Sequence, residues 1–389
     1  MGDFAMGIKV HMFPAKNGDC LLLETPRRNI LIDGGYADTY YSALKPFILS
    51  RSDSIVIDLA IVTHIDHDHI SGIITLISDN GCATTPRITP IKQVWHNGYN
   101  QLPGNKPAGI LSASELELLK GYSISYSSDI VSEQISGIQG MSLSSLLILN
   151  GYSWNSAVSG KAVCTENIQH YTIDDDIIIT LISPSQKQLL ALMEYWWREL
   201  KSKKWGFRLT NDPAFNSAME AFLLSDIDYY DVRNEDINSS GSIPLHSLAA
   251  QCVSPDLSCT NASSIAFMLQ SQGKNLLFLA DATEKQIVES LDSIPTKYFD
   301  LIKVPHHGSL GNANQLFDYI DGQFFLISTD GTKHNHPDRA TLAKIVTRPS
   351  LKQRTLVFNY PNDAYHYFNN PILMSEYNFT VQLSYEVNL

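Results

Sequence analysis

The sequence predicts an α/β fold, and three observations support this prediction. Short apolar runs rich in β-branched residues recur along the chain and indicate strands. Segments with helical spacing follow several of these runs. Clusters of histidine and aspartate come directly after strands, which is where open α/β sheets place their functional sites.

Turn residues bound the predicted strands, as at Asn17-Gly18-Asp19 and Asp33-Gly34-Gly35. The strands are expected over Ile8–Phe13, Cys20–Glu24, Asn29–Ile32, Ile55–Val62, Ile177–Ile182, Ser264–Leu269, Asn275–Leu279, Leu301–Val304 and Phe324–Ser328. Helices are expected over Tyr40–Leu49 and Ile70–Ser78 and from about Arg339. The run Ile55–Val62 is broken only by Asp58, which predicts a strand buried on both faces.

The composition is that of a globular protein, with 389 residues of which 44% are hydrophobic and 17% charged. We expect one catalytic domain over residues 1–389 with two insertions. The first, at about 97–180, is rich in Ser, Gly and Asn and predicts loops and strands. The second, at about 184–250, predicts helices with a mobile stretch over Asp226–Ser240.

Three bulk properties limit the classes of function. No apolar run is long enough for a membrane span, and the five scattered cysteines suggest reduced thiols, so we expect a cytoplasmic protein without membrane contact. The net charge of −12 argues against broad, metal-free binding to nucleic acid. It leaves open an enzyme that meets phosphates through bound metal ions.

The strongest chemical signal is the run His64-Ile65-Asp66-His67-Asp68-His69 after the strand Ile55–Val62. Such a density of ionisable groups is costly unless the groups are paired or bind metal. Histidine and carboxylate are the usual ligands of zinc, manganese and iron. A surface histidine tract is the alternative, and the buried strand before the run argues against it.

Three further clusters follow predicted strands. Asp281 ends an apolar strand and fits either a helix cap or a metal ligand. Adjacent side chains point in different directions, so at most one of His306 and His307 is expected to bind a metal. The third cluster contains His336, which precedes a proline. Seven of the 12 histidines fall in the three short histidine clusters, His64, His67, His69, His306, His307, His334 and His336.

This set of motifs resembles the metallo-β-lactamase superfamily. The matching elements come in the superfamily's order, as Asp33-Gly34-Gly35, residues 64–69, Asp281 and His306. The resemblance is closest to the hydrolase domain of ComEC-type competence proteins, which carry an aspartate where Asp66 stands. That branch also has a glycine-aspartate turn (Gly18-Asp19), an Asp-Ala strand end (Asp281-Ala282), a K-V-x-H-H-G-S string (Lys303–Ser309) and a late His-Pro (His336-Pro337).

The resemblance implies a four-layer αββα sandwich with loop and helical insertions, matched over about residues 8–345. It also implies two divalent metal ions, and the oxygen of Asp66 favours manganese over zinc. The expected metal ligands are His64, Asp66, Asp68, His69, Asp281 and His306, with His336 as the alternative to His306. The expected catalytic residues are Asp66, Asp68 and His307. Asp33, His96 and His336 are expected to contact the substrate or to support ligands, and His96 is the nearest candidate for the superfamily's missing third-motif histidine.

The expected activity is hydrolysis of a phosphodiester by a water activated between two metals, as in a phosphodiesterase or nuclease. A nucleic acid or nucleotide is then the substrate. Two alternatives stay open. The same fold supports hydrolysis of a carbon-centred ester, lactone or thioester. The chain also fits a partner-binding component of a multi-gene defence or DNA-processing system, with the insertions contacting a protein partner.

Overall fold

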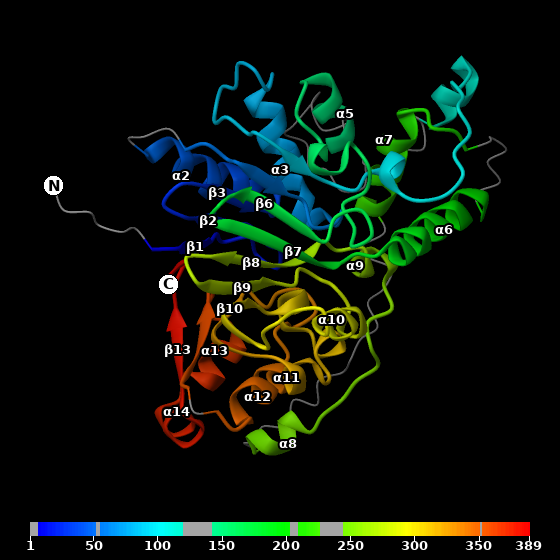
Figure 1. Ribbon diagram of the computed structural model, residues 1–389. Coiled ribbons are helices and arrows are strands. Elements are labelled where there is room, and N and C mark those ends of the chain that lie inside the picture. Colours follow the sequence, from blue (N-terminus) through cyan, green and yellow to red (C-terminus); the bar gives the residue numbers. More distant parts are fainter. Residues whose placement is uncertain (1–6, 52–54, 120–141, 203–208, 226–243, 351) are drawn as a thin grey trace.

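Two β-sheets lie face to face in the computed structural model, and helices cover the outer side of each (Figure 1). The structure describes residues 7–51, 55–119, 142–202, 209–225, 244–350 and 352–389. The expected mobile stretch Asp226–Ser240 lies outside these residues. The predicted mixed α/β class, with two sheets flanked by helices, is confirmed.

The first sheet has six strands in the order β14-β1-β2-β3-β4-β5. Its strands are β1 (Lys9–Met12), β2 (Leu21–Glu24), β3 (Asn29–Ile32), β4 (Leu59–Ile61), β5 (Val94–Trp95) and β14 (Glu386–Asn388). The pairs from β14 to β3 are antiparallel, and β3, β4 and β5 are parallel.

The second sheet has eight strands in the order β13-β12-β11-β10-β9-β8-β7-β6. They are β6 (His170–Asp174), β7 (Ile177–Ser183), β8 (Ala266–Ser271), β9 (Lys274–Phe278), β10 (Tyr298–Lys303), β11 (Asp321–Ile327), β12 (Arg354–Phe358) and β13 (Phe379–Leu383). The strands from β9 to β13 run parallel to one another.

The helices divide between the two outer layers. The layer on the first sheet contains α1 (Ala37–Thr39), a π-helical segment (Tyr40–Leu44), α2 (Lys45–Ser50), α3 (His67–Asn80), α5 (Leu143–Leu149), α6 (Gln186–Ser202) and α7 (Ala214–Ser225), with α9 (Cys259–Ala262) beside α6. The layer on the second sheet contains α8 (Leu245–Ala249), α10 (Glu284–Leu291), α11 (Leu316–Tyr319), α12 (Arg339–Thr347), α13 (Asp363–Phe368) and α14 (Pro371–Tyr377).

The buried apolar residues form three clusters, one for each space between layers. The cluster between the sheets includes Trp95 and Phe278, and the cluster under the second helical layer includes Phe317 and Phe358. Four layers require three such interfaces, so the clusters match the layered architecture.

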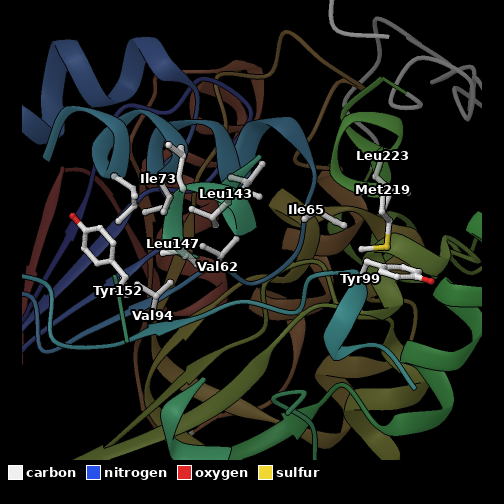
Figure 2. Packing of buried hydrophobic residues seen from close by; sticks show 14 of the residues in the cluster. Val62, Ile65, Ile73, Val94, Tyr99, Leu143, Leu147, Tyr152, Met219 and Leu223 are labelled. Atoms are coloured by element: carbon white, nitrogen blue, oxygen red, sulfur yellow. The ribbon is translucent and has the colours of Figure 1, made fainter. Parts of the chain in front are cut away.

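The predicted insertions contribute to the core above the first sheet. Figure 2 shows Leu143 and Leu147 of α5 beside Val62 and Ile73, with Met219 of α7 in the same cluster. Because α5 and α7 share the core of the helix α3, they stabilise the helix that carries much of the histidine run.

Several sequence predictions need correction. The run Ile55–Val62 forms a strand only over β4, which pairs with β3 over Leu59–Ile61, and makes an isolated bridge at Ile57. Helix α3 begins at His67 rather than Ile70, so half of the histidine run lies in its first turn. The region 97–180 contains the helix α5 besides loops and strands. No described helix is both long and apolar enough to cross a lipid bilayer.

Two glycines allow the loop after β3 to lie directly on α3. A Cβ atom on Gly72 would lie 1.9 Å from the Gly34 carbonyl oxygen, and one on Gly34 would lie 2.5 Å from the Ile73 nitrogen. Backbone hydrogen bonds of 2.8 Å join Gly34 N to His69 O and Gly72 N to Gly35 O. This close approach brings the residue before Gly34, which is Asp33, next to the first turn of α3.

We predict that Gly72→Ala lowers the free energy of unfolding by about 1–3 kcal/mol, because the added methyl group overlaps backbone that cannot rotate away. Urea denaturation of both proteins measures the difference. Ser78→Ala, at a partly exposed site on the same helix, is the matched control and should change stability by no more than about 0.5 kcal/mol. Equal stability of Gly72→Ala and wild type would contradict this packing argument.

Candidate metal centre

The candidate site lies where parallel strands of both sheets end. The first sheet contributes Asp33 after β3 and His64 after β4, and the second contributes Asp281 after β9 and His306-His307 after β10. A hydrogen bond of 2.8 Å from Ile265 N to Thr63 O joins the two sheets here. Carboxyl ends of parallel strands meet at one edge, which explains why residues far apart in sequence converge.

Asp281 stands at the centre of four imidazoles. It is 3% exposed, and four histidine Nε2 atoms surround its Oδ2 oxygen. The distances are 3.8 Å to His64, 3.7 Å to His69, 3.7 Å to His306 and 3.9 Å to His307. All four Nε2 atoms therefore face one carboxylate oxygen without reaching hydrogen-bond distance.

Asp33 orients two of these rings. Its Oδ2 lies 2.8 Å from His69 Nδ1 and accepts a 2.7 Å hydrogen bond from the Thr63 hydroxyl. The Thr63 oxygen in turn lies 3.0 Å from His64 Nδ1. Since a carboxylate only accepts, and the Thr63 proton goes to Asp33, both Nδ1 atoms act as donors. The Nε2 atoms of His64 and His69 are then left as the nitrogens that can bind a metal.

The other two rings are held in the same way. His307 Nδ1 donates to the Ser328 carbonyl oxygen at 2.8 Å. His306 Nδ1 donates to Asn312 Oδ1 at 2.9 Å, while the Asn312 amide nitrogen donates to Asp256 Oδ2 at 3.1 Å. Both rings thus direct Nε2 toward Asp281. Second-sphere acceptors of this kind are the usual support of metal-binding histidines.

The arrangement leaves several buried polar atoms without a partner. Among the described residues, the Nε2 atoms of His64, His69 and His307 and the Oδ1 atom of Asp281 make no hydrogen bond. Unpaired buried polar groups are unfavourable, and lone pairs facing a carboxylate repel it. A cation among them removes both costs, so the donor set fits a metal.

The pKa shifts of Asp281 and His69 also indicate that the site favours positive charge. Burial acts to raise the pKa of Asp281, but the imidazoles, His306 first, outweigh it and hold that pKa well below its ordinary value. Burial acts to lower the pKa of His69, and the charges of Asp281 and Asp33 outweigh it and raise that pKa. Protons on imidazole and a bound metal ion are alternative ways to balance these carboxylates.

The two carboxylates of the histidine run, Asp66 and Asp68, also lie beside the site. Asp66 Oδ2 lies 3.5 Å from His64 Nε2. Asp68 Oδ2 accepts a 2.7 Å hydrogen bond from the Asn17 side chain, and burial raises the pKa of Asp68. His67 points elsewhere, with its ring 5.1 Å from that of Tyr36.

The expectation that adjacent histidines point apart is wrong for His306 and His307. Both have left-handed backbone conformations, with φ of 43° and 53°. Side chains alternate only in an extended strand. In this tight turn both rings reach Asp281, although His306 is more exposed than His307.

Two predicted residues lie around the cluster rather than within it. The His336 ring is 5.5 Å from the His306 ring, and burial with the charges of His306 and His334 lowers the pKa of His336 to about 3. His96 Nε2 lies 3.1 Å from Glu220 of α7, and the structure does not bring His96 into contact with Asp281. This pair joins the end of β5 to the helix α7 instead.

Several residues of the site were not predicted from the sequence. Asp19 is one of them. It offers a carboxylate oxygen that lies, with one ligand atom each from His69, Asp281 and His307, in a buried set within 4.8 Å of one another. Thr63, Asn312, Asp256 and Ser328, which support the histidine rings, are further examples. The Gly18-Asp19 turn was visible in the sequence, but an aspartate in a turn usually has a local structural role.

Divalent metal should stabilise the protein by satisfying these atoms. We predict that Mn²⁺ or Zn²⁺ added to chelator-treated protein raises the thermal unfolding midpoint, with about 2.7 kcal/mol of stabilisation at free metal one hundred times Kd. His64→Ala should abolish the effect. His170→Ala, on the edge strand β6, is the matched control and should retain it. A wild-type midpoint that no divalent metal raises would show that the cluster is not a metal centre.

Solved structures align with nearly the whole of this chain, but with low TM-scores. Zn²⁺-bound PqqB from Methylobacterium extorquens is 10% identical, with 98% of this chain and 100% of that chain covered and a TM-score of 0.40. YhfI from Bacillus subtilis, a metallo-beta-lactamase fold protein, is 10% identical, with 97% and 96% covered and a TM-score of 0.35. The diiron β-hydroxylase CmlA from Streptomyces venezuelae is 9% identical with a TM-score of 0.38, and all of this chain spans 55% of CmlA. Scores this low carry no argument about activity.

No curated protein matches the chain significantly. A family model does match, and it is that of the metallo-beta-lactamase superfamily over residues 14–148. The matched segment contains Asp33 and the whole run from His64 to His69. Over this segment the chain is similar to the metallo-beta-lactamase superfamily, and its two sheets flanked by helices are consistent with that fold.

Proposed function

We propose that this chain is a metal-dependent phosphodiesterase or nuclease that holds two divalent ions around Asp281. The observation that carries the proposal is the convergence of four Nε2 atoms on Asp281 Oδ2, each with its Nδ1 hydrogen tied to an acceptor. Such a site suits metal ligation and has no structural use without a cation.

The ligands divide into two groups around Asp281. We assign His64 and Asp66 to the first ion and Asp68 and His69 to the second, with Asp281 between them. His307 belongs with the second group, because its ring lies 5.4 Å from that of His69. We assign His306 to the first group, which otherwise has a single imidazole, because its Nε2 also lies 3.7 Å from Asp281.

Bound there, the ions would supply a hydroxide at neutral pH and neutralise charge on a phosphodiester. The protein's own part is orientation. Asp33 holds the His69 and His64 rings, and Asn312 with Asp256 holds His306. His336 is a neutral imidazole at pH 7, because its pKa is lowered to about 3, and we assign it to substrate contact rather than proton donation.

Asp66 supports two further parts of the proposal, the identity of the metal and the branch of the superfamily that the chain resembles. An oxygen ligand in place of a histidine makes the first group harder, which favours manganese over zinc. The same aspartate, with the Lys303–Ser309 string and His336-Pro337, relates the chain to the hydrolase domain of ComEC-type proteins. A nuclease or nucleotide phosphodiesterase is therefore the leading activity.

The activity test compares ligand variants on a generic phosphodiester. With Mn²⁺, we predict that wild type cleaves bis(p-nitrophenyl) phosphate and that Asp66→Ala and His64→Ala lower kcat/KM at least about 100-fold. His170→Ala should keep wild-type kinetics. A parallel panel of single-stranded DNA, RNA and cyclic nucleotides then identifies the substrate.

Two outcomes would overturn this proposal. Asp66→Ala with full activity on every substrate that is cleaved would remove the two-ion assignment. Turnover of p-nitrophenyl acetate or a lactone, with none of any phosphodiester under any metal, would favour the ester hydrolase instead.

Asp33 offers a separate test of the supporting layer. We predict that Asp33→Asn weakens metal affinity about 10- to 100-fold, because the amide no longer fixes the His69 ring with its Nε2 unprotonated. Titration of apo-protein against a chromophoric chelator measures the change. Asp58→Asn, at a buried aspartate paired with Arg28, is the matched control, and equal loss in both variants would indicate a general effect of buried charge.

A further inference from the structure

We propose that Asp19 is a further carboxylate ligand of this metal centre and that Lys303 holds it in place. The proposal rests on the proposed function, because it adds a residue to the same site. Asp19 comes just before β2 in the chain. It therefore belongs to a different segment from the histidine run, Asp281 and the His306-His307 turn.

The ion pair between Asp19 and Lys303 is almost completely buried. Asp19 Oδ2 lies 2.7 Å from Lys303 Nζ, and the two side chains are 2% and 1% exposed. The Lys303 ammonium also donates to the Val304 carbonyl oxygen at 3.2 Å. Lys303 is the last residue of β10, so its side chain crosses from the second sheet to the start of the first.

The second carboxylate oxygen of Asp19 has no partner. Oδ1 is buried and makes no hydrogen bond. It lies 3.7 Å from His307 Nδ1, but that nitrogen already donates to the Ser328 carbonyl oxygen. One oxygen of Asp19 is therefore held by a cation and the other has no partner, while Asp19 offers a ligand atom within 4.8 Å of those of His69, Asp281 and His307.

Comparison with other ion-paired aspartates shows that this pattern is not simply structural. In Asp321, Oδ1 and Oδ2 accept separate 2.8 Å hydrogen bonds from Arg354. In Asp58, Oδ1 accepts from Arg28 and Lys92, and Oδ2 accepts from the Asn29 backbone nitrogen. A pair that served stability alone would satisfy both oxygens in this way.

The backbone fixes Asp19 beside the second group of ligands. A Cβ atom on Gly18 would lie 2.0 Å from the Asp68 carbonyl oxygen, so only glycine lets the turn approach the first turn of α3. Gly35 N donates to Asp19 O at 2.7 Å, and the Ser328 hydroxyl donates to Gly18 O at 2.9 Å. A carboxylate held this firmly is preorganised for a metal.

The test measures metal binding by the purified full chain in three variants. Asp19→Asn removes the ligand oxygen's charge. Asp19→Asn combined with Lys303→Met removes both buried charges, so that a folded protein is available even if the single variant is destabilised. Asp58→Asn is the matched control, since it makes the same change at another buried, ion-paired aspartate.

The readouts are bound metal per chain, Mn²⁺ affinity by titration and the visible absorption of the Co²⁺-loaded protein. We expect two ions in wild type and in Asp58→Asn. In the two Asp19 variants, we expect the affinity for one of the two ions to fall at least about 10-fold. The visible absorption of Co²⁺ at that ion's site should also differ from that in wild type.

Failure of this inference is distinguishable from failure of the proposed function. If wild type binds two ions, and a folded double variant binds both with affinities within threefold and the same Co²⁺ absorption, Asp19 is not a ligand and the two-metal centre stands. If wild type binds no divalent metal, the proposed function fails and this inference fails with it.

Discussion

The tethering of four imidazoles around one buried carboxylate is the interaction on which the rest of the site depends. Each Nδ1 hydrogen is committed to an acceptor, so each Nε2 lone pair faces Asp281. Lone pairs and a carboxylate repel one another in a medium of low dielectric. The architecture therefore holds together a set of groups that is stable only with positive charge among them.

Both sheets are needed to build this set. His64 and Asp33 follow strands of the first sheet, whereas Asp281 and His307 follow strands of the second. Lys303 adds a buried ion pair that joins the same two sheets at Asp19. Burial of the apolar cluster between the sheets thus also sets the separation of the ligands. The predicted insertions stabilise the first sheet's side through the core that α5 and α7 share with α3 (Figure 2).

The supporting residues could not be predicted because their partners are distant in sequence. Asn312 looks like an ordinary turn residue, and its role appears only when it lies between His306 and Asp256. His96 follows a strand as a ligand would, yet its Nε2 meets Glu220, 124 residues away. The C-terminal strand β14 has no chemical motif, and it joins the first sheet only by pairing with β1 at the other end of the chain.

The sequence by itself determined the α/β class, the strand ends that carry chemistry and the histidine and aspartate run, since these depend on local periodicity and on residue type. The tertiary structure decided which atoms meet. Left-handed backbone at His306 and His307 directs both rings toward the same oxygen of Asp281. Asp19 lies beside the metal-ligand residues, whereas His96 contacts Glu220 instead. Contacts between residues that are far apart in the chain follow from how the sheets pack, and local pattern contains no information about that.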